Sequence, residues 1–270
     1  MKISVISLFR DSKDTIHECL DRLESLEMST DASFKYSFYE NDSIDNTKDI
    51  LEEWVKNRDG SLISEKLNAP KFGSIPSQTR VELMAYYRNK AANNIKHTNS
   101  DFVVVFDSDV IFNPDIINEF IPYMKKDIAI ATPNITQNIK CKMCGCGKDS
   151  YYDSWAFIDN NMNFGMTWSC NPCYNKEDRK KWSNGDPVEV FAAFGGLSII
   201  NGKMFDQAQW YTSSGTCEHF GLCDSLSHLG KTIVIPTIKT SVEIDSDTIN
   251  NIQKSSIDQV IKHQKGKLNE

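Results

Sequence analysis

Short runs of Val, Ile and Phe recur along the chain, and segments with apolar residues at helical spacing lie between them. The runs predict β-strands, because they are rich in β-branched and aromatic residues and are bounded by polar turns. The predicted strands are 2–9, 35–40, 61–66, 101–107, 127–132, 188–200 and 232–238. Helical spacing of apolar residues predicts helices over 14–26, 47–56 and 79–95.

This alternation of strands and helices predicts a Rossmann-like α/β fold, with a mixed, mainly parallel sheet covered by helices on both faces. Residues from about 134 to 186 break the pattern and are rich in Cys, Asn, Trp and Tyr. We interpret this Cys-rich stretch as a functional insertion, because long structureless loops are uncommon inside compact domains. We therefore expect one domain over residues 1–245 and a polar tail over 246–270, with a weak helix near 257–263.

Composition and charge exclude some classes of protein. With 270 residues, 40% hydrophobic, the chain can bury a full core. A net charge of −7 without a basic stripe argues against nucleic-acid binding. We expect no integral membrane segment, because no apolar run approaches the roughly 20 residues that cross a bilayer. The first apolar run, 2–9, is too short for a secretory signal.

The most specific chemical signal is a pair of carboxylates, Asp107 and Asp109, which follow an apolar strand with Ser108 between them. Ligands of α/β sheets bind at the carboxyl ends of strands. Two carboxylates suit Mn²⁺ or Mg²⁺, and a substrate's phosphates can complete the coordination. The alternative is a plain turn, in which Asp and Ser bond to the backbone. The apolar strand before the pair favours the metal site.

A second acidic segment, residues 39–47, follows the second predicted strand and leads into a helix. It resembles a segment of family-two glycosyltransferases in which an early acidic residue binds the nucleobase. The resemblance makes Glu40 and Asp42 the candidates for base binding. We expect Asp45 and Thr47 only to cap the helix.

Arg80, Arg88 and Asn89 lie on the predicted helix that precedes the Asp107 strand. The two arginines are about two helical turns apart and so lie near one face. Arginine binds phosphate oxygens with paired hydrogen bonds, so we expect one of them to contact a diphosphate. For Arg80, a surface ion pair with Glu82 is an equally good interpretation.

Three candidates for proton transfer, Glu218, His219 and Asp224, lie in the segment 218–230. This segment also resembles family-two glycosyltransferases, in which an acidic pair opens a helix and the second acid deprotonates the acceptor. In this chain that second position is His219. Glu218 or Asp224 could serve instead, and so could His219, because an imidazole titrates near neutral pH.

The order of motifs over residues 36 to 243 resembles the fungal capsule-associated α-1,3-mannosyltransferase family. The matching stretches are Arg80, Arg88-Asn89, Asp109-Val110, Tyr152 to Trp155 with Asp159, Phe191 to Gly196, and Glu218 to Asp224. The resemblance implies a GT-A glycosyltransferase that uses GDP-mannose and a divalent metal and retains the α configuration. It also places Asp153 and Trp155 in the donor site. The chain differs from these relatives at Asp107, where they usually have Asn.

The resemblance also implies roles and partners. The metal on the Asp-x-Asp pair would neutralise the departing diphosphate, and Glu218 would orient the sugar or stabilise positive charge. Gly195 and Gly196 would let a sugar ring approach the backbone, or would simply form a bulge. We expect a nucleotide sugar and a glycan acceptor as partners. We expect a cytoplasmic or otherwise soluble location for the chain as given, and the Golgi lumen if an anchor has been removed, because these relatives are commonly membrane-anchored there.

Five of the eight cysteines are spaced like zinc ligands. These five are Cys141, Cys144, Cys146, Cys170 and Cys173. Four of them could form one tetrahedral site with structural Zn²⁺, and the alternative is disulfides, which a secretory compartment would favour. We expect Cys19 in the core, and Cys217 and Cys223 either to pair or to pack.

Three other functions compete with this interpretation. A nucleotidyltransferase should have a glycine-rich loop after the first strand, and residues 8–16 contain no glycine. A non-catalytic carbohydrate-binding protein on the same fold would use its tryptophans as stacking platforms. An inverting enzyme that uses a UDP-sugar is the third alternative.

Overall fold

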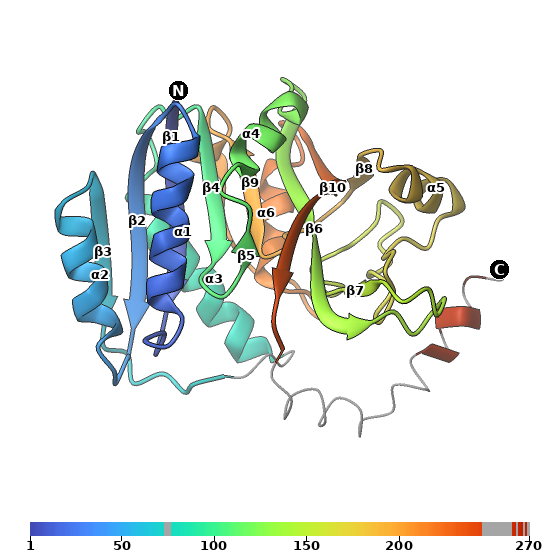
Figure 1. Ribbon diagram of the computed structural model, residues 1–270, viewed down its shortest axis with the longest axis horizontal. Helices are drawn as coiled ribbons and strands as arrows, with labels where there is room; N and C mark the ends of the chain where they lie inside the picture. Colours follow the sequence, from blue (N-terminus) through green and yellow to red (C-terminus); the bar gives the residue numbers. More distant parts are fainter. Residues whose placement is uncertain (73–76, 245–260, 263, 267, 269–270) are drawn as a thin grey trace.

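The computed structural model describes residues 1–72, 77–244, 261–262, 264–266 and 268 and places ten strands in one twisted sheet (Figure 1). The order across the sheet is β3 (Gly60–Glu65), β2 (Ser33–Asn41), β1 (Lys2–Phe9), β4 (Phe102–Asp107), β9 (Leu197–Asn201), β6 (Ile128–Lys140), β10 (Lys231–Val242) and β5 (Ile111–Phe112). Two short strands lie off this path: β7 (Asp149–Tyr151) pairs with β6, and β8 (Val188–Val190) pairs with β10.

Strand direction brings the functional segments to one edge of the sheet. The strands β3, β2, β1 and β4 are parallel, so their carboxyl ends share an edge. Strand β9 runs antiparallel to β4 and begins at that same edge. In the register, Phe9 at the end of β1 lies beside Glu40 of β2, and Leu8 lies beside Asp107 of β4. Glu40 and Asp107 are therefore two strand spacings apart, about 10 Å.

Helices cover both faces of the sheet, as the alternating pattern predicts. One face packs against α1 (Ile16–Ser29), α2 (Thr47–Lys56) and α4 (Ile116–Phe120), which η1 (Ile121–Tyr123) follows. The other packs against α3 (Gln78–Asn93), η2 (Phe205–Gln207) and α6 (Glu218–Leu226). Figure 1 shows α1 in front of the sheet and α3 behind it. Strand β4 serves both cores, because its side chains alternate: Val104 and Phe106 join the first and Val103 and Val105 the second.

The structure corrects two of the predicted elements. The strand predicted over 188–200 is two strands, β8 and β9, because the consecutive glycines Gly195 and Gly196 both have a φ of 65° and cannot continue a strand. The insertion predicted from residue 134 begins later, since β6 continues to Lys140. The insertion also contains a helix, α5 (Lys176–Asn184), whose Asn175 side chain caps its first turn. This helix was not predicted, whereas the helices predicted over 14–26, 47–56 and 79–95 are confirmed as α1, α2 and α3.

Most of the predicted tail, including residues 245–260, lies outside the described residues. Of the helix predicted near 257–263, the structure describes residues 261 and 262, which are helical. Within the described part of the chain, no helix combines the length and apolar character needed to cross a bilayer.

Candidate active site

A buried arginine joins the strand-end and helix-start segments into one site. Arg88 on α3 has a side chain that is 1% exposed. Its Nη2 donates to Oδ1 of Asp107 at 2.7 Å, and its Nε donates to Oε1 of Glu218 at 3.1 Å. Glu218 is 5% exposed and opens α6, whose N-terminal amide groups favour a negative charge. The Arg88 guanidinium therefore binds two carboxylates that lie far apart in the sequence.

The Arg88 guanidinium is only partly satisfied by these contacts. Its Nη1 is buried and has no hydrogen-bond partner among the described residues. The guanidinium also lies over the ring of Phe194, 5.0 Å from the ring centroid. Burial lowers the pKa of Arg88, but the two carboxylates together outweigh this and raise the pKa overall, so the side chain stays charged. A buried donor without a partner is unusual, and it favours a polar ligand in this place.

His219 lies beside Glu218 in a neutral form. Its Nε2 is 3.3 Å from Oε1 of Glu218, and its ring stacks on Phe194 with 3.6 Å between centroids. Burial, and then the positive charges of Arg88 and Arg80, lower the pKa of His219 well below the usual value. We assign the proton to Nε2, because only an N–H can donate to the carboxylate. His219 is consequently a weak proton acceptor.

The Asp-x-Asp turn presents carboxylate oxygens at the open end of β4. The amide of Asp107 donates to the carbonyl of Gly196 at 2.8 Å, and the amide of Val110 donates back to the carbonyl of Asp107. Ser108 is half-buried, and Asp109 reaches solvent at the strand end although protein surrounds much of its carboxylate. Desolvation by the surrounding protein, and then the charge of Asp107, raises the pKa of Asp109 to about 6. A divalent cation would reverse this effect, since it stabilises the charged carboxylates.

The paired glycines hold a third carboxylate near this turn. The amide of Gly195 donates to Oδ2 of Asp153 at 3.0 Å, while the Gly196 carbonyl binds the Asp107 amide. Burial is the main cause that raises the pKa of Asp153 to about 7, and the charges of Asp107 and Glu218 raise it further. A Cβ on Gly195 would come within 2.8 Å of the Pro133 carbonyl. The close backbone packing therefore explains why this position requires glycine.

Trp155 follows Asp153 in the same loop, and its exposure is intermediate. Its indole Nε1 donates to the carbonyl of Gly215 at 3.1 Å. This contact orients the ring between the insertion and the loop that precedes α6.

The two base-binding candidates lie at the end of β2. The Glu40 carboxylate is buried and accepts hydrogen bonds from the Ser43 amide at 2.8 Å and the Ser64 hydroxyl at 2.7 Å. Asp42, with a φ of 55°, accepts hydrogen bonds from the amides of Leu67, Asn68 and Ala69. Burial raises the pKa of Asp42, but these bonds and one from Asn41 outweigh it and lower the pKa overall. Asp42 therefore fixes the loop after β3, whereas Glu40 ties the turn after β2 to β3.

The helix-capping expectation agrees with the structure for Asp45 but not for Thr47, whose hydroxyl accepts a hydrogen bond from the Ser12 amide at 2.7 Å. The Asp45 carboxylate accepts a hydrogen bond from the amide of Thr47 at 2.9 Å, at the first residue of α2.

Two other candidates have protein partners of their own. The Asn89 amide pairs with the backbone of Trp210, donating to its carbonyl at 2.7 Å and accepting from its amide at 3.0 Å. Asp224 accepts a hydrogen bond from the Tyr211 hydroxyl. It lies six residues along α6 from Glu218, about 9 Å along the helix axis. Both side chains thus anchor the segment 210–211.

The structure groups four of the five predicted zinc ligands. The sulfur atoms of Cys141, Cys144, Cys146 and Cys170 all lie within 4.8 Å of one another. The fifth, Cys173, is 1% exposed and packs in the hydrophobic core, so its inclusion in the zinc set is wrong. Cys19 is also in the core, as expected, and Cys217 and Cys223 are buried free thiols that pack.

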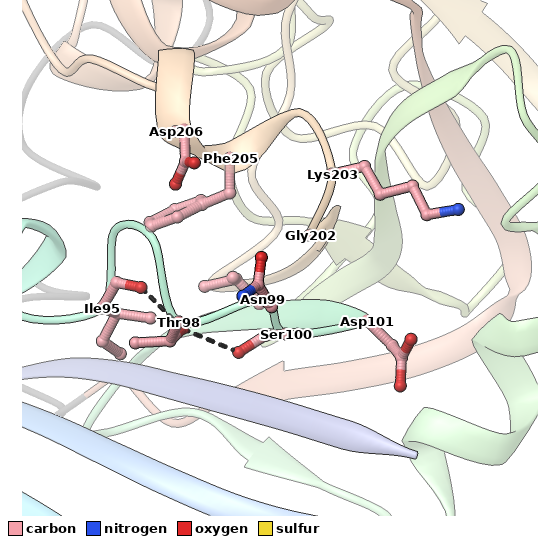
Figure 2. A pocket seen from close by; sticks show the side chains of 10 residues that line it. Ile95, Thr98, Asn99, Ser100, Asp101, Gly202, Lys203, Phe205 and Asp206 are labelled. Carbon is pink, nitrogen blue, oxygen red and sulfur yellow. Dashed lines mark hydrogen bonds between the residues drawn. The ribbon is translucent and has the colours of Figure 1, made fainter.

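A cavity of about 320 Å³ lies away from all of these residues, at the opposite edge of the sheet. Figure 2 shows its lining by the segments just before β4 and just after β9, with Phe205 and Asp206 above them. None of the sequence-predicted site residues lines it. The length of β4, about 17–20 Å, separates this cavity from the Asp107 end.

Phe194 was missed by reasoning from the sequence. It covers both His219 and Arg88, yet it lies in an apolar run that predicts only a buried strand. The adjacent Gly195-Gly196 pair was the available signal that this run leaves the sheet.

Three solved structures share this fold at low sequence identity. The S. aureus TarS fragment 1–349 has a TM-score of 0.52 and 14% identity, over 90% of this chain and 60% of that one. GalNAc-T7 with UDP, GalNAc and Mn²⁺ has a TM-score of 0.54 and 15% identity, over 90% and 44%. The mannosyltransferase PcManGT from Pyrobaculum calidifontis, in complex with GDP-Man and Mn²⁺, has a TM-score of 0.52 and 12% identity, over 90% and 57%. The chain thus spans three fifths or less of the length of these proteins.

A search of curated proteins found no match. The family described as Cryptococcal mannosyltransferase 1 matches residues 4–233, a range that includes Arg88, the Asp-x-Asp turn and Glu218. The chain therefore belongs to the Cryptococcal mannosyltransferase 1 family of glycosyltransferases and has the GT-A fold.

Proposed function

We propose that the protein is a metal-dependent mannosyltransferase that transfers mannose from GDP-mannose to a glycan acceptor with retention of the α configuration. The observation that carries the proposal is the buried Arg88, which joins the strand-end Asp107 to the helix-start Glu218. The family match and the GDP-Man and Mn²⁺ bound to PcManGT support the choice of donor and metal.

The carboxylates at the end of β4 fit a hard divalent cation. Asp107 uses Oδ1 for Arg88, which leaves Oδ2, and Asp109 is exposed without a hydrogen bond to another described residue. Oxygen ligands of this kind suit Mn²⁺ or Mg²⁺. When bound there, the metal would neutralise charge on the departing diphosphate. The role of Asp107 and Asp109 is to hold it at the open edge of the sheet.

The donor would lie along this edge with its base near Glu40 and its diphosphate near Asp109. The two-strand separation of Glu40 and Asp107 suits a nucleoside diphosphate laid across β1. Arg80 is close enough to lower the pKa of His219 and would contact the diphosphate. Arg88 would act indirectly: its hydrogen bonds go to Glu218 and Asp107, so it positions these carboxylates and offsets their negative charge.

Retention is favoured by the state of the candidate bases. An inverting reaction needs a base opposite the leaving group, and His219 is buried with a lowered pKa. Asp224 is hydrogen-bonded to Tyr211. Glu218 remains, held by Arg88 beside the site, where its charge would stabilise positive charge developing on the sugar. The leaving phosphate would then take the acceptor proton on the same face.

We predict that Glu218→Gln reduces transfer more than His219→Asn does. Loss of one preorganised charged group should lower kcat about 10²–10³-fold, whereas His219→Asn should lower it less than about tenfold. Initial rates of nucleotide release measure both variants, and denaturant unfolding shows that each is folded under assay conditions. A larger loss for His219→Asn would make the imidazole the catalytic base. Proton NMR of the first product gives the stereochemistry, and a β signal would contradict retention.

A thermal-shift screen tests the donor. GDP-mannose with Mn²⁺ at about 100 times its Kd should stabilise the native state by about 2.7 kcal/mol and raise Tm on the order of 5 °C. UDP- and dTDP-sugars should give smaller shifts, and omitting Mn²⁺ should reduce the GDP-mannose shift. The largest shift with a UDP-sugar would overturn the proposed donor. An enzyme should also hydrolyse the nucleotide sugar that gives the largest shift, in a metal-dependent reaction, whereas a carbohydrate-binding protein should not.

A further inference from the structure

Four cysteine side chains converge from two parts of the chain. Cys141, Cys144 and Cys146 lie in the connection between β6 and β7, and Cys170 lies between β7 and α5. The sulfur of Cys141 is 3.3 Å from that of Cys144. The sulfur of Cys170 is 3.7 Å from that of Cys144 and 3.5 Å from that of Cys146. We call these four residues the four-cysteine cluster.

These distances match a tetrahedral metal site better than disulfides. Zinc–sulfur bonds of about 2.3 Å place the sulfur atoms of a tetrahedron about 3.8 Å apart. A disulfide requires about 2.05 Å. The amide of Cys170 also points to the sulfur of Cys141 at 3.3 Å, a contact that orients and stabilises a thiolate ligand.

We propose that the four-cysteine cluster binds one structural Zn²⁺ ion. Four thiolates fill a tetrahedral zinc shell, so no coordination position remains for water or substrate. Four thiolates and one Zn²⁺ carry a net charge of −2, and positive side chains lie beside the cluster. Lys239 interacts electrostatically with Cys170 and with Lys148. The site is separate from the Asp107 edge, which offers oxygen ligands.

The zinc closes the base of a functional loop. Cys146 and Cys170 flank residues 147–169, and backbone hydrogen bonds cross the same base: Tyr151 amide to Ser169 carbonyl at 2.7 Å, and Lys142 amide to Trp168 carbonyl at 2.9 Å. The loop carries Asp153 and Trp155. A metal clip that closes a loop of this length removes conformational freedom from the unfolded chain. Its effect on the donor site rests on the proposed function, but zinc binding itself does not.

The metal content of the purified protein tests the proposal. Wild type should contain about one zinc per chain, because one tetrahedral site takes one ion. Cys144→Ser and Cys146→Ser should lose most of it. Both side chains are exposed, so these substitutions leave core packing unchanged. Cys19→Ala and Cys173→Ala, at buried cysteines outside the cluster, should keep the zinc. Equal zinc in wild type and the two serine variants would overturn the proposal.

Two further readouts distinguish bound zinc from a disulfide. Cobalt-substituted wild type should show thiolate-to-metal charge transfer and intense tetrahedral d–d bands, which Cys144→Ser should lack. Hydrogen exchange in residues 147–169 should rise in Cys144→Ser while β1 and β4 keep their protection. An intact mass lowered by the hydrogens lost on disulfide formation, with no bound zinc, would contradict the proposal. A negative result in these zinc experiments would not contradict the proposed transferase activity, which the nucleotide-release assays test separately.

Discussion

Replacing Arg88 with Met is expected to lower the free energy of unfolding by about 3–5 kcal/mol, because removing one partner of a buried ion pair leaves the other charge uncompensated. Arg88 is the cation between Asp107 and Glu218, and Glu218 is itself buried. Urea unfolding gives the value, provided that the slope m stays unchanged.

A neighbouring ion pair on the same helix provides the control. Lys90→Met breaks a pair with Glu65 at 3.1 Å, but the lysine is 40% exposed, so this substitution should destabilise the protein far less than Arg88→Met does. The double variant Arg88→Met/Glu218→Gln should recover part of the loss, since it removes the stranded charge. Equal effects of Arg88→Met and Lys90→Met would contradict the central role of Arg88.

Asp109→Asn is expected to lower the rate of transfer by about 10³-fold or more while the fold stays intact. A metal supplies several kcal/mol of transition-state stabilisation, and each 1.36 kcal/mol is a factor of about ten in rate. The fold should be unaffected because Asp109 is exposed at a strand end. Nucleotide release from GDP-mannose at saturating Mn²⁺ measures the loss.

The matched control is Asp31→Asn, which changes an exposed carboxylate two residues before β2, at the opposite edge of the sheet from Asp109. It should retain full activity and the wild-type Tm. If Asp109→Asn instead kept its activity, the metal would have to be held by other residues.

Local sequence was sufficient to predict the strand ends and which residues lie there. The apolar run before Asp107 and the helical spacing around Arg88 placed both residues in their elements, and the parallel sheet brought them to one edge. That Arg88 would bind two carboxylates was not predictable, because Glu218 lies 130 residues away and the contact depends on how α3 packs against α6.

The wrong predictions also concern features that depend on contacts between distant parts of the chain. The stretch 188–200 has strand-like composition, but two left-handed glycines interrupt it, and the packing of Gly195 against Pro133 is set by a distant strand. Five cysteines have zinc-like spacing, and only the folded insertion shows that Cys173 turns into the core. Likewise, no local pattern indicates that Asn89 pairs with the Trp210 backbone.

The most direct test is nucleotide release from GDP-mannose by wild-type protein before and after removal of loosely bound divalent metal. We predict Mn²⁺-dependent release of GDP that stops on chelation and returns when Mn²⁺ or Mg²⁺ is added, but not in Asp109→Asn. Measured zinc should stay constant throughout, which keeps the four-cysteine cluster out of the comparison. Release of GDP that continues unchanged after chelation, or equally in Asp109→Asn, would contradict a metal-dependent transferase site at the end of β4.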